Sequence, residues 1–209
     1  DINDNIWFGT SAGVQMFDGT NWTSYSVSTH PSMPSDNIKV ISAMSNGDIW
    51  IGTDFGASRF DGIDWTTYTT STMQSIPLIS NQVKSIDEEP STGIVWIGTN
   101  QGVTPLDLSG VTNSLSIGAP DLHWGGVNAT SFDSNGDIWF SSPLGGITYY
   151  DGVNYTTYDT STGLLSQYAT DLIIDNQDNK WVGTASGVSV LDASNTTFTQ
   201  YTRMYIMPP

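Results

Sequence analysis

Ile49-Trp50-Ile51-Gly52-Thr53 is one of five nearly identical stretches in this chain of 209 residues. The other four are Ile6-Trp7-Phe8-Gly9-Thr10, Val95-Trp96-Ile97-Gly98-Thr99, Ile138-Trp139-Phe140-Ser141-Ser142 and Lys180-Trp181-Val182-Gly183-Thr184. Successive tryptophans are 43, 46, 43 and 42 residues apart. A fixed period of this length is typical of repeat architectures, in which each repeat is one supersecondary unit.

The best-preserved repeat, from Asn37 to Tyr68, is predicted to form four short strands. Asn46-Gly47 and Asp61-Gly62 are hairpin-turn sequences, and they separate stretches rich in β-branched and aromatic residues. No helical periodicity competes with this pattern, because Gly or Pro interrupts the chain every several residues. The expected strands include Ile38–Ile41, Ile49–Thr53, Ser58–Phe60 and Trp65–Tyr68.

Four antiparallel strands in about 43 residues correspond to one blade of a β-propeller. We therefore predict an all-β propeller of four-stranded antiparallel blades, with about five blades visible. The recurring tryptophans, Trp7, Trp50, Trp96, Trp139 and Trp181, are expected to be structural and buried at equivalent positions between blades. The predicted units are 1–25 (an incomplete blade), 36–68, 81–117, 127–158 and 167–201, with 202–209 as a linker or closing strand.

Both ends of the chain interrupt the repeat. Asp1 has the same register as Asp133, so the first unit lacks its own first strand. Only eight residues follow Tyr201, and Pro208-Pro209 is typical of the entry to a further loop. We expect the chain to be part of a larger propeller of six to eight blades, although Met204–Met207 as a ring-closing strand is an alternative.

The composition is strongly acidic. Five Lys and Arg stand against 21 Asp and Glu, which gives a formal net charge of −16. Nucleic-acid binding is excluded as a general function, because it needs a basic surface. The chain has no cysteine, so disulfides and thiolate metal sites are absent, and no apolar run approaches the ~20 residues that span a membrane.

The motif Asn-x-Val-x-x-Ile-Asp, followed by a Gly turn, Ile-Trp-Ile-Gly-Thr, Gly-x-x-x-Phe-Asp-Gly and Trp-Thr-Thr-Tyr, resembles the two-component-regulator propeller repeat. The matching stretches are Asn81–Asp87, Ile49–Thr53, Gly56–Gly62 and Trp65–Tyr68. Ser141-Ser142, Pro105-Leu106 and the long loop Val111–Gly126 depart from the motif. These departures put the regularity of the third and fourth blades in doubt.

The resemblance implies one of two settings. Such arrays form the periplasmic sensor halves of hybrid two-component systems, which often sense glycans. Similar arrays occur in secreted and cell-surface proteins of Bacteroidetes-type bacteria. The high Thr, Ser and Asn content and low Lys content resemble the secreted group. We expect a non-catalytic secreted or surface module that binds a glycan or a protein, with a periplasmic glycan-sensing domain as the alternative.

Side chains for catalysis are scarce. His30 and His123 are the only histidines, and neither lies in a recognisable catalytic motif. We expect the chain not to be an enzyme and to need no cofactor. A metal-dependent propeller lyase is a less favoured alternative, because such an enzyme needs a histidine in its channel and these two histidines lie in unrelated loops.

Two stretches have oxygen ligands at alternate positions, as Ca²⁺ sites do: Asp133–Asp137 and Asp175–Asn179. Both run directly into a tryptophan strand and lack the downstream glutamate of an EF-hand loop. We therefore expect Asx-rich hairpin turns rather than metal sites. Glu88-Glu89 is expected to be a solvated pair in an expanded turn.

A ligand site is expected on the loops that join the second strand of a blade to the third, because these loops vary while their flanks do not. Phe55 offers an aromatic face for a neutral or glycan-like ligand. The polar partners expected with it are a carboxylate and two amides, and the unusual His-Trp pair of the long loop is expected on the same loop face. The candidate binding residues are Asp54, Phe55, Asn100, Gln101, His123 and Trp124.

Overall fold

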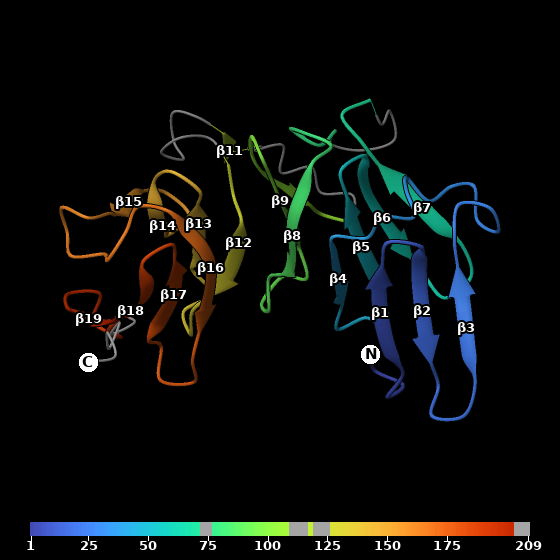
Figure 1. Ribbon diagram of the computed structural model, residues 1–209, viewed down its shortest axis with the longest axis horizontal. Coiled ribbons are helices and arrows are strands. Elements are labelled where there is room, and N and C mark those ends of the chain that lie inside the picture. Colours follow the sequence, from blue (N-terminus) through green and yellow to red (C-terminus); the bar gives the residue numbers. More distant parts are fainter. Residues whose placement is uncertain (72–76, 109–116, 119–125, 203–209) are drawn as a thin grey trace, which may run out of the picture. The chain divides into compact units, whose positions relative to one another are not determined.

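A computed structural model of the chain describes residues 1–71, 77–108, 117–118 and 126–202. Every regular element in the described residues is a β-strand (Figure 1). The chain divides into two compact units, Asp1–Gly118 and Ala119–Pro209. Each unit is described by itself below.

The first unit contains three antiparallel sheets (Figure 1). The first sheet has three strands, β1 (Ile6–Thr10), β2 (Gly13–Phe17) and β3 (Trp22–Tyr25). The second has four strands in chain order, β4 (Val40–Ala43), β5 (Ile49–Thr53), β6 (Gly56–Phe60) and β7 (Trp65–Tyr68). The third also has four strands, β8 (Val83–Glu88), β9 (Val95–Thr99), β10 (Gly102–Leu106) and the short β11 (Ile117–Gly118).

The second unit contains two antiparallel four-stranded sheets. One consists of β12 (Ala129–Phe132), β13 (Ile138–Ser142), β14 (Gly146–Tyr150) and β15 (Tyr155–Tyr158). The other consists of β16 (Ala169–Ile174), β17 (Lys180–Thr184), β18 (Gly187–Leu191) and β19 (Phe198–Tyr201). The predicted all-β class and the four-stranded antiparallel unit are confirmed.

The departures from the repeat motif leave the strands intact. Pro105 lies in β10 opposite Trp96, and β10 keeps five paired residues. Ser141 and Ser142 complete β13 in full register with β14. In the third sheet the fourth strand is the short β11, in which Ile117 pairs with Val103 of β10.

The Thr-x-x-Gly hairpins explain why threonine and glycine recur in every unit but the fourth. Thr53 donates its hydroxyl to the Gly56 carbonyl (3.0 Å) and accepts the N–H of Phe55 (2.9 Å). Thr10, Thr99 and Thr184 make the same pair of bonds. Gly56 has a φ of 132°, and a Cβ there would lie 2.6 Å from the Tyr68 carbonyl oxygen. Glycine is therefore required by both conformation and space.

Glycine in the second strand lets neighbouring sheets approach closely. A Cβ on Gly52 would lie 2.4 Å from Cγ1 of Val83, in the first strand of the next sheet. A Cβ on Gly9 would lie 2.6 Å from Cγ2 of Ile38, just before β4. These positions therefore mark sheet-to-sheet packing within the first unit.

The core of each unit lies between consecutive sheets. Trp50 and Tyr68 pack in one apolar cluster with residues of the next sheet, including Val83, Ile86 and Ile97. In the second unit Trp139 packs with Leu172 and Val182 of the following sheet. Burial of this apolar surface is the main stabilising term for blades that cannot bury both faces alone.

The expectation that all five tryptophans are buried is wrong for Trp181. Trp50, Trp96 and Trp139 are buried and Trp7 is half-buried, whereas Trp181 is 38% exposed. The cause is local to the last sheet. The clusters that bury Trp50 and Trp139 are completed by the sheet that follows each of them, and no described sheet follows β16–β19.

A hydrogen bond from the indole to an acidic side chain also recurs in these repeats. Trp7 donates to Asp1 (2.7 Å), Trp96 to Glu89 (3.3 Å), Trp139 to Asp133 (3.1 Å) and Trp181 to Asp175 (2.9 Å). Trp50 is the exception, because Met44 stands where the carboxylate would be, and its Nε1 has no partner among the described residues. Asp1, Asp133 and Asp175 thus act as turn residues that hold the tryptophans.

Candidate functional site

The predicted binding loops connect β5 to β6 and β9 to β10, and they lie at the same end of two neighbouring sheets. Val83 lies close to both loops. It packs over Gly52, which directly precedes Thr53 at the start of the first loop, and it pairs with Thr99 at the start of the second loop. The loops are two residues long, Asp54-Phe55 and Asn100-Gln101. Each is held by its Thr-x-x-Gly hydrogen bonds, so the scaffold presents these side chains on short, well-fixed turns.

Phe55 is the main apolar feature of this loop end. Its side chain is 63% exposed, although it lies in a turn whose neighbours in sequence are buried. Beside it, Asp54 forms an ion pair with Lys39, with 3.5 Å between Oδ2 and Nζ. Both charged side chains are partly exposed, so the pair contributes little to stability and remains accessible to a ligand.

The second loop contributes amide groups. The Asn100 Oδ1 accepts a hydrogen bond of 2.6 Å from the buried Ser80 hydroxyl, which fixes the orientation of the amide. With Oδ1 engaged in this way, the Nδ2 group of Asn100, which has no acceptor among the described residues, can donate to a ligand. Gln101 is exposed, and its side chain has no hydrogen-bond partner among the described residues. The arrangement offers one aromatic face and several neutral donors and acceptors.

The structure places four of the six predicted binding residues at this loop end; His123 and Trp124 lie outside the described residues. Lys39 and Ser80 were not predicted as part of the site. Lys39 is one of only five basic residues and directly precedes β4, a position that could have suggested it. Ser80 could not have been found, because a serine in a Ser-rich connection carries no distinguishing signal.

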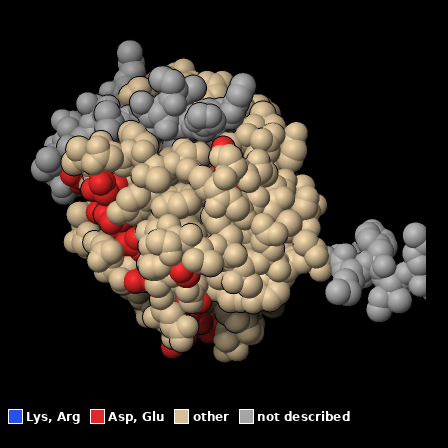
Figure 2. Space-filling view, turned by 90° about the vertical axis from the view of Figure 1, so that its left-hand side faces the viewer, with Lys and Arg blue, Asp and Glu red and all other residues tan. Residues whose placement is uncertain are grey.

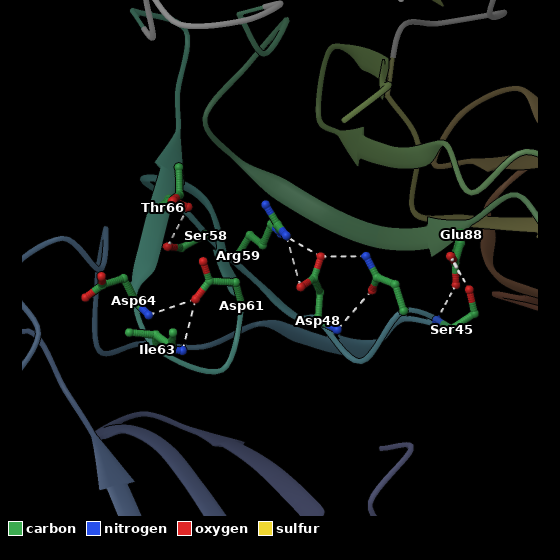
Figure 3. Close-up of polar contacts among 10 residues, drawn as sticks. Ser45, Asp48, Ser58, Arg59, Asp61, Ile63, Asp64, Thr66 and Glu88 are labelled. Atoms are coloured by element: carbon green, nitrogen blue, oxygen red, sulfur yellow. Dashed lines mark hydrogen bonds and ion pairs between the residues drawn. The ribbon is translucent and has the colours of Figure 1, made fainter. Parts of the chain in front are cut away.

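The opposite end of the same sheet holds a polar network that is satisfied internally (Figure 3). The Arg59 guanidinium contacts both carboxylate oxygens of the buried Asp48, at 2.6 and 3.1 Å. The Asp48 carboxylate, through its hydrogen bond and charge, raises the pKa of Arg59. Asp48 also accepts from the Asn46 amide. These contacts join the hairpin turn to β6 within one sheet, and we interpret the network as structural.

The two stretches with Ca²⁺-like spacing are hairpin turns. Asp133 accepts the N–H groups of Asn135 and Asp137 with one oxygen and the Trp139 indole with the other. Asp175 makes the equivalent bonds, and those from Trp181 and Asn179 hold its pKa well below the usual range. Among the described residues, no three His, Asp or Glu side chains are grouped so that they could hold a metal ion.

The remaining titratable candidates have structural contacts. His30 lies against Tyr25 with ring centroids 5.2 Å apart and ring planes tilted by 49°, and it shares a hydrogen bond of 2.9 Å with Thr29. Glu88 accepts two bonds of 2.6 Å from Ser45, and Glu89 accepts from the Trp96 indole. Glu88 and Glu89 are half-buried, and each carboxylate holds a turn.

The described surface is acidic. Figure 2 shows Asp and Glu side chains along the face it presents, and no Lys or Arg among the described residues there. Such a surface repels polyanions over a distance set by the ionic strength. Within the described part of the chain, no helix has the length and apolar composition needed to cross a membrane.

No protein-family model and no curated protein sequence matches the chain. Solved structures match it over nearly its whole length. The extracellular domain of a putative hybrid two-component system from B. thetaiotaomicron covers 86% of this chain, with a TM-score of 0.67 and 22% identity. Virginiamycin B lyase from Staphylococcus aureus covers 97%, with a TM-score of 0.73 and 13% identity.

The chain has the β-propeller fold. PorZ, a surface component of the type-IX secretion system of Porphyromonas gingivalis, is a further structural neighbour, covering 95% of this chain with a TM-score of 0.65 and 17% identity. The resemblance to two-component-regulator propellers is thereby confirmed at the level of the fold. This propeller chain spans 24% of the two-component domain, 32% of PorZ and 67% of the lyase.

Proposed function

We propose that this propeller is a non-catalytic module of a secreted or cell-surface protein that binds a neutral, glycan-like ligand at the loop end of β4–β11. The observation that carries the proposal is Phe55, a large aromatic side chain that is 63% exposed on a loop at the same end as the amide-bearing loop of the next sheet. An aromatic face flanked by hydrogen-bonding groups is the usual chemistry of a carbohydrate subsite.

The amides define the polarity of the ligand. Gln101 offers a donor and an acceptor, and Asn100 offers its amide N–H group while Ser80 fixes its oxygen. Sugar hydroxyl groups can donate and accept hydrogen bonds, so they can pair with both amide side chains. The net charge of −16 disfavours anionic ligands. Lys39 is paired with Asp54 and leaves little positive charge for an acidic sugar.

The location outside the cytoplasm is supported by the neighbours. They include extracellular domains of putative two-component systems and a bacterial surface component. The same neighbours favour the second candidate function, a periplasmic domain that senses its ligand for a two-component regulator. Both candidates place a binding site on the loops and differ in what the rest of the polypeptide does with the bound ligand.

Catalysis is not part of the proposal, although virginiamycin B lyase is among the structural neighbours. The four described binding residues include an aromatic ring, two amides and a carboxylate paired with a lysine. They include no histidine, serine, cysteine or lysine that could serve as a nucleophile beside its base. Incubation of the chain with each class of glycan that binds, followed by mass spectrometry, tests whether the chain is non-catalytic. A glycan that is cleaved or otherwise changed in mass would contradict the proposal.

A glycan array probed with the wild-type chain tests the proposed function. We expect binding to neutral oligosaccharides and its loss in Phe55→Ala. Ile63→Ala is the matched control, because Ile63 is an 81% exposed apolar side chain in the β6–β7 turn at the opposite end of the same sheet. Binding that survives Phe55→Ala, or that follows polyanions, would contradict the proposal.

A further inference from the structure

Tyr168 is an exposed aromatic residue in the second unit. It directly precedes β16, and its side chain is 47% exposed. Among the described residues, its hydroxyl has no hydrogen-bond partner and its ring makes no aromatic contact. A tyrosine ring that the protein does not cover is a surface on which an apolar face of a ligand can stack.

Three hydrogen bonds fix the backbone that carries this ring. The Tyr168 N–H donates to the hydroxyl of the buried Ser166 (3.2 Å), and the Tyr168 carbonyl accepts the N–H of Ala185 (3.1 Å). The preceding carbonyl, of Gln167, accepts the N–H of Gly146 (2.9 Å). Ala185 lies in the β17–β18 loop and Gly146 begins β14. The segment is therefore tied to the loop ends of both sheets of the second unit.

The exposure of this position is a property of the repeat. Asn37 lies shortly before β4 and donates its N–H to the Ser35 hydroxyl (3.1 Å). Gln82 directly precedes β8 and donates to the Ser80 hydroxyl in the same way (3.3 Å). Both residues are exposed, and Asn37 is exposed although the second sheet packs against a described sheet on each side. What differs at Tyr168 is the aromatic side chain.

The groups around Tyr168 are either apolar or polar and neutral. Leu144, in the β13–β14 loop two residues before Gly146, is 45% exposed. Gln167 and Ser186 are exposed, and their side chains have no hydrogen-bond partner within the described part of the chain. The Gln167 amide and the Ser186 hydroxyl can each donate and accept. Together with the ring, these groups match the two surfaces of a sugar, its C–H face and its hydroxyls.

The charge of this unit favours a neutral ligand. Among the described residues of the second unit, Lys180 is the only Lys or Arg, and it is 1% exposed. Its ammonium group donates to Asn195 (2.7 Å) and lies 4.8 Å from the centroid of the Trp139 ring, so it offers no charge at the surface. Asp171, three residues after Tyr168, is exposed and adds negative charge. Anionic sugars are therefore disfavoured.

We propose that Tyr168 forms a second carbohydrate site, in the second unit, that takes one neutral sugar residue. The ring stacks on the C–H face of the sugar, and Gln167 and Ser186 bond to its hydroxyls. The site has the ligand class of the proposed function but shares no residue with it, so each can fail without the other. A single sugar on so exposed a site should have a dissociation constant of about 1 mM or above, which is too weak to hold the chain on a glycan array.

Amide NMR spectra of the isotope-labelled chain test the proposal. The probes are the methyl glycosides of glucose, galactose, mannose and N-acetylglucosamine. We expect at least one of them to shift the amide signals of Gln167, Tyr168 and Ser186 in a saturable manner. Phe55→Ala should leave these shifts unchanged, whereas shifts of the Phe55 and Gln101 amides in the wild type report on the other site.

Tyr168→Gln is the decisive variant. Glutamine occupies the same position at Gln82, so the backbone bonds should persist and the thermal midpoint should not change. Loss of the ring should weaken binding of the methyl glycoside about tenfold or more, whereas Tyr168→Phe keeps the ring and should retain the affinity. Val153→Ala is the control and should have no effect, because Val153 is a 79% exposed apolar residue in the β14–β15 turn.

Two results would overturn the proposal. One is the absence of shifts at these three amides with all four methyl glycosides, and the other is an unchanged dissociation constant in Tyr168→Gln. Neither result bears on the Phe55 site, which is read from the amides of its own loops.

Discussion

Ser134 donates both its backbone N–H and its hydroxyl to the carboxylate of Asp178, which lies 44 residues later and in the next sheet. These two bonds are the main cause of the lowered pKa of Asp178. Ser45 and Glu88 repeat the arrangement in the first unit, with both bonds at 2.6 Å. Neighbouring blades are thus held by a polar contact at their turns in addition to the apolar contact of their faces.

Ser45→Ala removes both the hydroxyl and its bond to Glu88 while leaving the N–H bond in place. The contact is exposed, so we expect a loss of about 1 kcal/mol in the free energy of unfolding. Urea denaturation followed by tryptophan fluorescence measures it. Ser186→Ala is the control. Ser186 is exposed and its hydroxyl has no hydrogen-bond partner among the described residues, so the urea midpoint should not change.

Met44→Asn tests the role of the recurring indole hydrogen bond. Met44 is buried, and a polar residue there would ordinarily cost several kcal/mol, but the new amide oxygen can accept from the unpartnered Trp50 Nε1. We expect a loss below about 1 kcal/mol. Leu78→Asn, at an equally buried position of the same cluster, should lose about 3 kcal/mol. Equal losses of stability in both variants would show that an acceptor at position 44 does not bond to the Trp50 indole.

Gly56→Ala and Gly62→Ala separate backbone strain from steric contact. Both glycines have positive φ, at 132° and 94°, but a Cβ meets the Tyr68 carbonyl oxygen at 2.6 Å only at Gly56. Gly62→Ala should cost about 1 kcal/mol for its conformation alone. Gly56→Ala should cost clearly more, about 3 kcal/mol, because the β6–β7 pair must also shift. Thermal unfolding of the two variants gives the comparison directly.

The pattern of tryptophans predicted the fold because it reports the apolar contact of each blade with the next. It failed at Trp181, where exposure depends on whether a further sheet is present, and no local signal encodes that. The strands of the third and fourth repeats form despite Pro105 and Ser141, because pairing with their neighbours outweighs local preference. Four of the six candidate binding residues lie at one loop end as predicted, whereas their partners Lys39 and Ser80 come from connections whose sequences are unremarkable.

Stability should fall in acid. Hydrogen bonds lower the pKa of six aspartates in the folded chain: Asp18, Asp61, Asp151, Asp175, Asp178 and Asp192. Because the pKa of each aspartate is lower in the folded chain, the unfolded chain binds more protons below about pH 4. The contribution of these aspartates to the free energy of unfolding is therefore present above that pH and is lost as the pH falls through their pKa values in the folded chain.

Urea midpoints measured from pH 6 down to pH 2 test this dependence. Relief of repulsion within a chain of net charge −16 acts in the opposite direction, so the informative quantity is a difference between variants. Asp175→Asn removes the titrating group that accepts from Trp181. Its midpoint should depend less steeply on acid than that of the wild type. A parallel dependence in both proteins would show that Asp175 does not contribute.

The most direct measurement of the central claim, ligand binding at the loop end of β4–β11, is the affinity of a neutral oligosaccharide selected on the array. Isothermal titration of wild type, Phe55→Ala, Gln101→Ala and Ile63→Ala would give the four dissociation constants. We predict that Phe55→Ala weakens binding about tenfold or more, that Gln101→Ala weakens it several-fold, and that Ile63→Ala leaves it unchanged. Unchanged affinity in Phe55→Ala, or a loss confined to Ile63→Ala, would contradict the account.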